Sequence, residues 1–74
     1  MNRSLRHDAL LALSQNKMNP ESILLRLQEE PILTLRDADE NRWTFVRRHR
    51  CRRYLMAKLD GMKSYTEIYV SPCG

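Results

Sequence analysis

The chain has 74 residues, of which 42% are hydrophobic and 30% are charged. This length allows one domain with a modest core, and the balance of apolar and charged residues is typical of a folded chain rather than a disordered one. No stretch approaches the ~20 apolar residues of a membrane-spanning helix. We therefore expect one compact cytoplasmic domain over residues 1–74, with a short flexible tail at 71–74 and no contact with a membrane.

Charge divides the chain into two halves. Residues 1–41 hold five basic and seven acidic side chains, a net charge of −2, whereas residues 42–74 hold eight basic and two acidic ones, a net charge of +6. Ten of the thirteen basic residues are arginines, whose planar guanidinium groups pair with phosphate or carboxylate and stack on rings. A fold that keeps the two halves apart has a dipolar surface that attracts an acidic partner.

The N-terminal part predicts a helical hairpin. Leu5 to Gln15 carries an apolar stripe at helical spacing, with Ser4 as a candidate N-cap. A second helix begins where Asn19 can cap it and Pro20 fits the first helical position. Pro31 is expected to end this helix. Its three glutamates against one arginine argue against a recognition helix in the major groove of DNA.

A β-hairpin follows. Ile32 to Arg36 and Arg42 to Val46 each alternate apolar and polar residues, and the five residues between them, all polar except Ala38, form an acidic loop. In this hairpin Leu33 and Leu35 are expected to face Trp43 and Phe45. Aromatic rings beside arginines can also stack on unpaired bases, but so small a core needs both Trp43 and Phe45, and we expect them to be buried.

Residues 47–62 are ambiguous, and we favour a third helix there. Their Arg, Leu, Met, Ala and Lys content suits a helix, with Cys51, Leu55 and Leu59 on one face. The alternative is a strand hairpin turning at Asp60-Gly61. Tyr65 to Val70 alternates and predicts a last strand.

The expected fold is therefore a small α+β domain in the order α-α-β-β-α-β. The α-α-β-β part is similar, in element order alone, to the helix-turn-helix and wing of a winged-helix domain.

The arginine-rich segment from residue 42 to residue 58 is the candidate binding surface. Its cations suit phosphate contacts that weaken as salt is added. The candidate residues are Arg42, Arg47, Arg48, Arg50, Arg52, Arg53 and Lys58. On the predicted helix, Arg47, Arg50 and Arg53 lie away from the core face. The alternative is that these cations form internal ion pairs with Glu29, Glu30, Asp37 or Asp39.

Metal and catalytic sites are not expected. Asp37, Asp39 and Asn41 have the spacing of the first half of a calcium loop, but arginines occupy its sixth and twelfth positions. The remaining candidate ligands lack the spacing of structural zinc sites. They are His7, His49, Cys51 and Cys73. No glycine-rich phosphate loop and no nucleophile–base pair is evident, so we expect neither enzymatic activity nor a cofactor.

The function that follows is a small regulatory binding protein acting on nucleic acid, DNA or RNA, in gene regulation. The alternative partner is a large nucleic-acid enzyme such as RNA polymerase, on which a phage- or bacterial-type regulator would dock. A homodimer is a further option, because a marginal core gains stability from association.

Overall fold

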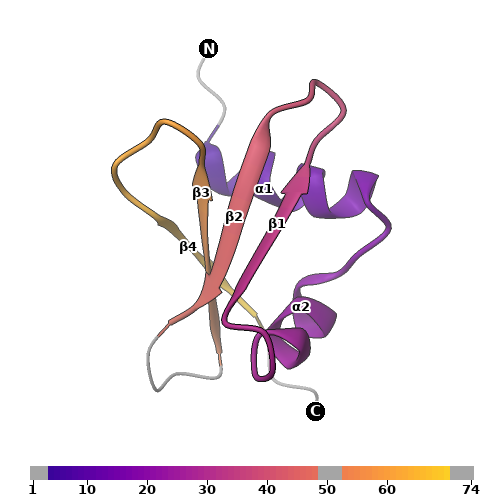
Figure 1. Ribbon diagram of the computed structural model, residues 1–74, viewed down its shortest axis with the longest axis vertical. Helices are drawn as coiled ribbons and strands as arrows, with labels where there is room; N and C mark the ends of the chain where they lie inside the picture. Colours follow the sequence, from indigo (N-terminus) through magenta and orange to yellow (C-terminus); the bar gives the residue numbers. More distant parts are fainter. Residues whose placement is uncertain (1–3, 49–52, 71–74) are drawn as a thin grey trace.

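The computed structural model describes residues 4–48 and 53–70, and within them two helices precede four strands (Figure 1). The elements are α1 (Leu5–Gln15), α2 (Pro20–Arg26), β1 (Ile32–Arg36), β2 (Arg42–Arg47), β3 (Tyr54–Leu59) and β4 (Thr66–Tyr69). The strands form one antiparallel sheet in the order β1-β2-β3-β4. The predicted tail at 71–74 lies outside the described residues.

The helix starts are those that the sequence predicts. Ser4 and Asn19 cap α1 and α2, because each side-chain oxygen accepts a hydrogen bond from the backbone N–H three residues later. After α1, Lys17 adopts a positive φ of 57° and the Met18 N–H donates to the Leu13 carbonyl at 2.9 Å. This arrangement satisfies carbonyls that a helix end otherwise leaves open. The second helix ends at Arg26, before the predicted stop at Pro31.

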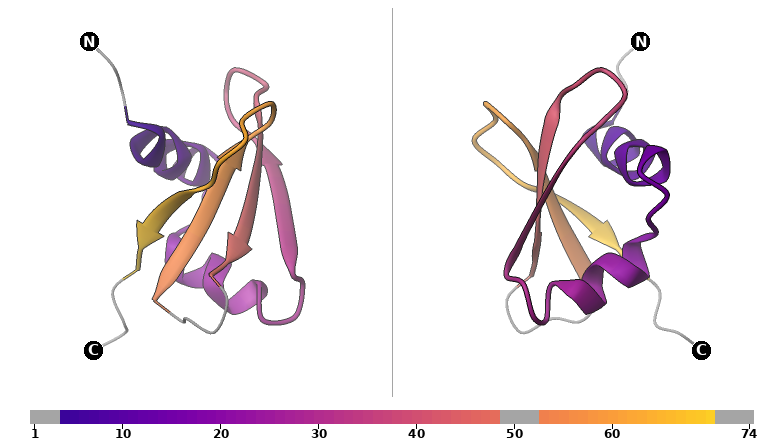
Figure 2. Two further views of the ribbon diagram at one scale, coloured as in Figure 1. Left: turned by 90° about the vertical axis from the view of Figure 1, so that its left-hand side faces the viewer. Right: turned by 45° about the vertical axis from the view of Figure 1, so that its right-hand side comes forward.

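Both helices lie on the same face of the sheet, and the core fills the space between (Figure 2). The predicted hairpin is present, and its register places Leu33 opposite Phe45 and Leu35 opposite Trp43. Trp43 and Phe45 are 2% and 0% exposed, which confirms their place in the core. The helices, the other strands and the residues that directly follow α2 and β4 add the buried side chains Ala9, Ala12, Leu13, Ile23, Leu24, Leu27, Leu55, Ala57, Ile68 and Val70.

The predicted third helix over residues 47–62 is wrong. Its described residues include the end of β2 and all of β3, and β3 pairs with both β2 and β4. The α-α-β-β-α-β order and the likeness to a winged-helix domain are therefore also wrong. The observed order is two helices followed by a four-stranded meander, a different small α+β arrangement.

The side-chain pattern of β3 explains why the strand forms in spite of a helix-favouring composition. Leu55 and Ala57 are 0% and 1% exposed, and they alternate with the partly exposed Tyr54, Met56 and Lys58. A strand places these two sets on opposite faces. Pairing with β2 and burial against the helices then outweigh a helix propensity that amounts to tenths of a kcal/mol per residue.

The alternative turn at Asp60-Gly61 is present, inside a longer connection. The Met62 N–H donates to the Leu59 carbonyl at 3.0 Å, and Gly61 has a φ of 93°. A side chain at this φ is strained, so glycine suits the position. The last strand, predicted over residues 65–70, is confirmed as Thr66–Tyr69.

Candidate functional site

The candidate cations are spread over both faces of the sheet rather than along one face of a helix. We call the face opposite the helices the open face. Strand alternation places Arg42, Arg48 and Lys58 on it, and places Arg47 on the helix side. Arg50 and Arg52 lie outside the described residues, so the predicted grouping of Arg47, Arg50 and Arg53 on a helix face is replaced.

Two of the candidate arginines pair with the chain's own carboxylates. Arg42 Nε lies 2.8 Å from Asp60 Oδ2, and an Arg48 guanidinium nitrogen lies 3.4 Å from Glu67 Oε2. The alternative of internal ion pairs is thus correct for these two, although the carboxylates differ from those expected. All four side chains are about half exposed, and exposed pairs contribute only about 0–1 kcal/mol. A phosphate group can therefore compete for either arginine.

Arg47 and Arg53 are exposed and have no carboxylate partner among the described residues. Arg47 ends β2, and Arg53 directly precedes β3. Because β2 and β3 are adjacent and antiparallel, both residues lie at the same end of the sheet as Arg48. We call Arg47, Arg48 and Arg53 the arginine end. An acidic partner can contact all three arginines once the weak Arg48–Glu67 ion pair is broken.

Tyrosines on the open face adjoin these cations, and the sequence reasoning missed them. The Arg48 guanidinium lies 5.0 Å from the centre of the Tyr54 ring, and Lys58 Nζ lies 5.2 Å from that of Tyr65. Tyr54 and Tyr69 meet edge to face, with ring centres 5.4 Å apart and planes at 68°. The alternation of β3 and β4 was the available signal, because it separates these rings from Leu55 and Ile68.

Burial of Trp43 and Phe45 removes the aromatic pair that the sequence offered for base stacking. Their ring centres are 6.5 Å apart inside the core. The rings on the open face are exposed instead, Tyr69 at 47% and Tyr65 at 37%.

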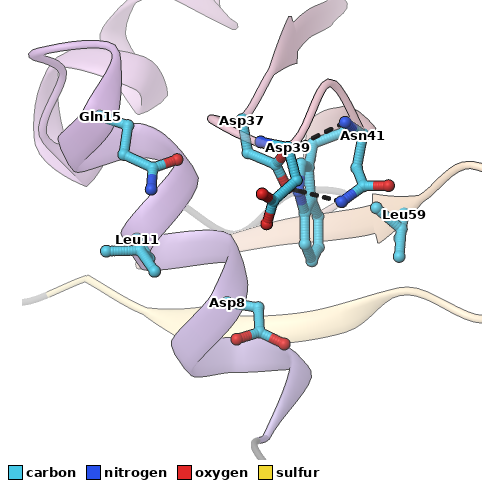
Figure 3. Close-up of a pocket in the computed structure, with 8 residues that line it drawn as sticks. Asp8, Leu11, Gln15, Asp37, Asp39, Asn41 and Leu59 are labelled. Carbon is cyan, nitrogen blue, oxygen red and sulfur yellow. Dashed lines mark hydrogen bonds between the residues drawn. The ribbon is translucent and has the colours of Figure 1, made fainter.

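A small pocket of about 120 Å³ lies between α1 and the β1–β2 loop (Figure 3). Its lining includes Asp8, Asp37, Asp39, Asn41 and Trp43. Asp37 has a structural role there. Its carboxylate accepts a 3.0 Å bond from the Trp43 indole N–H, and further bonds from the backbone of Asp39 and from Asn41.

These bonds favour the charged carboxylate. The indole bond contributes most, and the pKa of Asp37 is lowered from its ordinary value. The Asp37 carboxylate thus holds the loop together through hydrogen bonds from Trp43, Asp39 and Asn41.

Within the described part of the chain, no three His, Cys, Asp or Glu residues are placed to share a metal ion. His7 is exposed on α1. His49, Cys51 and Cys73 lie outside the described residues.

Comparison with protein-family models, with curated proteins and with solved structures gives no match. Of the described helices, neither has the length and apolar character needed to cross a bilayer.

Proposed function

We propose that this protein binds nucleic acid through the arginine end and the adjoining open face, as a regulatory protein without catalytic activity. The observation that carries the proposal is that Arg47 and Arg53 are exposed and, within the described residues, have no carboxylate partner. Guanidinium groups in this state meet phosphate without first breaking an ion pair. The sequence adds Arg50 and Arg52 to the segment between them.

Charge distribution supports the same partner. The C-terminal part from residue 42 carries +6 and the part before it −2, so the chain as a whole is positive by 4 charges and favours a polyanion as its partner. The acidic β1–β2 loop adjoins α1 (Figure 3), whereas the arginine end lies where β2 ends and β3 begins. A polyanion at the arginine end therefore avoids that loop.

The test is fluorescence anisotropy with labelled DNA and RNA oligonucleotides. We expect binding that weakens steeply as salt rises from about 50 mM to about 200 mM. The double variant Arg47→Glu/Arg53→Glu should bind at least about tenfold more weakly, and its salt slope should fall by about 1.4, since each phosphate contact on a single strand contributes about 0.7.

The matched control is Arg6→Glu/Arg26→Glu, which makes the same change of charge on exposed positions of α1 and α2. It should retain most of the binding. An equal loss of affinity in both variants would mean that net charge alone is responsible. It would contradict the assignment of binding to the arginine end. Absence of binding to every oligonucleotide at low salt would overturn the proposal. The alternative partner, a large nucleic-acid enzyme such as RNA polymerase, would then be sought in a pull-down after nuclease treatment.

A further inference from the structure

The open face carries a row of contacting side chains that crosses three chain segments. Tyr54 is paired with Tyr69 across β3 and β4, and the Arg48 N–H donates to the Tyr54 carbonyl from the β2 side. Arg48, Tyr54 and Tyr69 therefore lie side by side, in contact through the ring geometry given above. Lys58 and Tyr65 form a second cation–ring pair on the same face.

Helices α1 and α2 cover only the opposite face (Figure 2). The open face thus presents apolar and aromatic side chains that no described element covers. Those of at least partial exposure are Ile32, Val46, Tyr54, Met56, Tyr65 and Tyr69.

Exposed rings flanked by cations suit one class of ligand, a nucleic acid whose bases are unpaired. Each such base offers a free π-face that stacks on a tyrosine ring, and the phosphate beside it needs a cation. Bases within a duplex are already stacked on their neighbours, so the rings find no free face there.

The cations that now rest on the rings do not block this exchange. An exposed contact between a cation and a ring is weaker than the stacking of a base on an aromatic side chain. When a base replaces Arg48 over Tyr54, the guanidinium is released beside the strand that the base belongs to, where it can meet phosphate. Ring and cation therefore act together on one nucleotide.

We propose that the open face binds single-stranded nucleic acid, with Tyr54, Tyr65 and Tyr69 stacking on unpaired bases and Arg48 and Lys58 meeting the adjoining phosphates. The proposal rests on the nucleic-acid binding proposed above and specifies its ligand. The phosphate contacts of Arg47 and Arg53 then extend the path of the strand beyond the end of the sheet.

The experiment compares a single-stranded oligonucleotide with the duplex of the same sequence, using the full chain. We expect the single strand to bind at least about tenfold more tightly than the duplex. Tyr69→Ala and Tyr65→Ala should each weaken single-strand binding about fivefold or more, in line with the loss of one stacked base. Tyr69→Phe keeps the ring and should bind like the unchanged protein.

Leu25→Ala is the control, because Leu25 is a 66% exposed apolar residue on α2, away from the open face. It should leave binding unchanged. Thermal melting of each variant checks that the fold is intact. If single strand and duplex bind equally tightly and the tyrosine variants bind like Leu25→Ala, the open face is not the base-binding surface. Loss of binding in Arg47→Glu/Arg53→Glu would in that case still support the proposed function. A homodimer that Tyr69→Ala dissociates, with no nucleic acid bound, would assign the face to a second copy of the chain and overturn both.

Discussion

Arg48 joins the arginine-rich segment to the open face, because its guanidinium lies over the Tyr54 ring at 5.0 Å while it pairs with Glu67 at 3.4 Å. The Arg48 side chain thus makes two contacts, one with an aromatic ring and one with a carboxylate. A bound nucleotide would replace both contacts. Both contacts are exposed and individually weak. When a nucleotide binds at Arg48, the guanidinium exchanges these contacts for contacts with the nucleotide. The ion pair with Glu67 lowers the affinity, because it must be broken first.

Removing that carboxylate should strengthen binding. We expect Glu67→Gln to raise the affinity for a single strand, because Arg48 then meets a phosphate without losing an ion pair. Anisotropy at one fixed, low salt concentration measures this affinity. Glu30→Gln, which breaks the exposed Arg26–Glu30 pair on α2, is the matched control. An equal gain in both variants would mean that net charge alone is responsible.

Acid should destabilise the fold in part through Asp37. Its pKa is lowered in the folded state, chiefly by the bond from the Trp43 indole. This group therefore contributes stability above its ordinary pKa of 3.8, and the contribution is lost as the pH falls below that value. Urea unfolding followed by Trp43 fluorescence near neutral pH and near pH 3 measures the loss.

The variant Asp37→Asn should be less stable at neutral pH, and its free energy of unfolding should decrease less on acidification. Asp39→Asn removes a neighbouring carboxylate that accepts none of these bonds, and a matching result there would argue against the role of Asp37.

Leu55 tests the core under β3. The residue is fully buried and lies opposite Arg47 and Ile68 in the neighbouring strands. Leu55→Ala should lower the free energy of unfolding by about 2–5 kcal/mol, as large-to-small changes in cores do. Chemical denaturation measures this loss, with Leu25→Ala as the exposed control. A loss below about 0.5 kcal/mol, the level of surface changes, would contradict the position of β3 in the sheet.

The sequence predicts those elements whose signals are local. Ser4, Asn19 and Pro20 mark the helix starts, and the alternation around Trp43 marks the hairpin, because each signal acts within a few residues. The state of residues 54–59 depends on a partner strand distant in the chain. Leu55 and Leu59 share a face in a helix and in a strand alike, so the apolar positions alone do not distinguish the two.

The site was predictable only in part for the same reason. The charge of the arginine-rich segment is a property of composition and can be read directly. Which cations are paired depends on Asp60 and Glu67, whose neighbours are fixed by the strand register. Tyr54 and Tyr69 become a contacting pair only when β3 and β4 are adjacent, and a third helix in place of β3 would have separated them.

Amide chemical shifts of the full chain, followed during titration with a short single-stranded oligonucleotide, show directly which residues contact the nucleic acid. We predict salt-sensitive shifts concentrated at Arg47, Tyr54, Lys58, Tyr65 and Tyr69, with α1 and α2 unchanged. Shifts confined to the helices, or none at low salt, would contradict the assignment of this sheet face to nucleic acid.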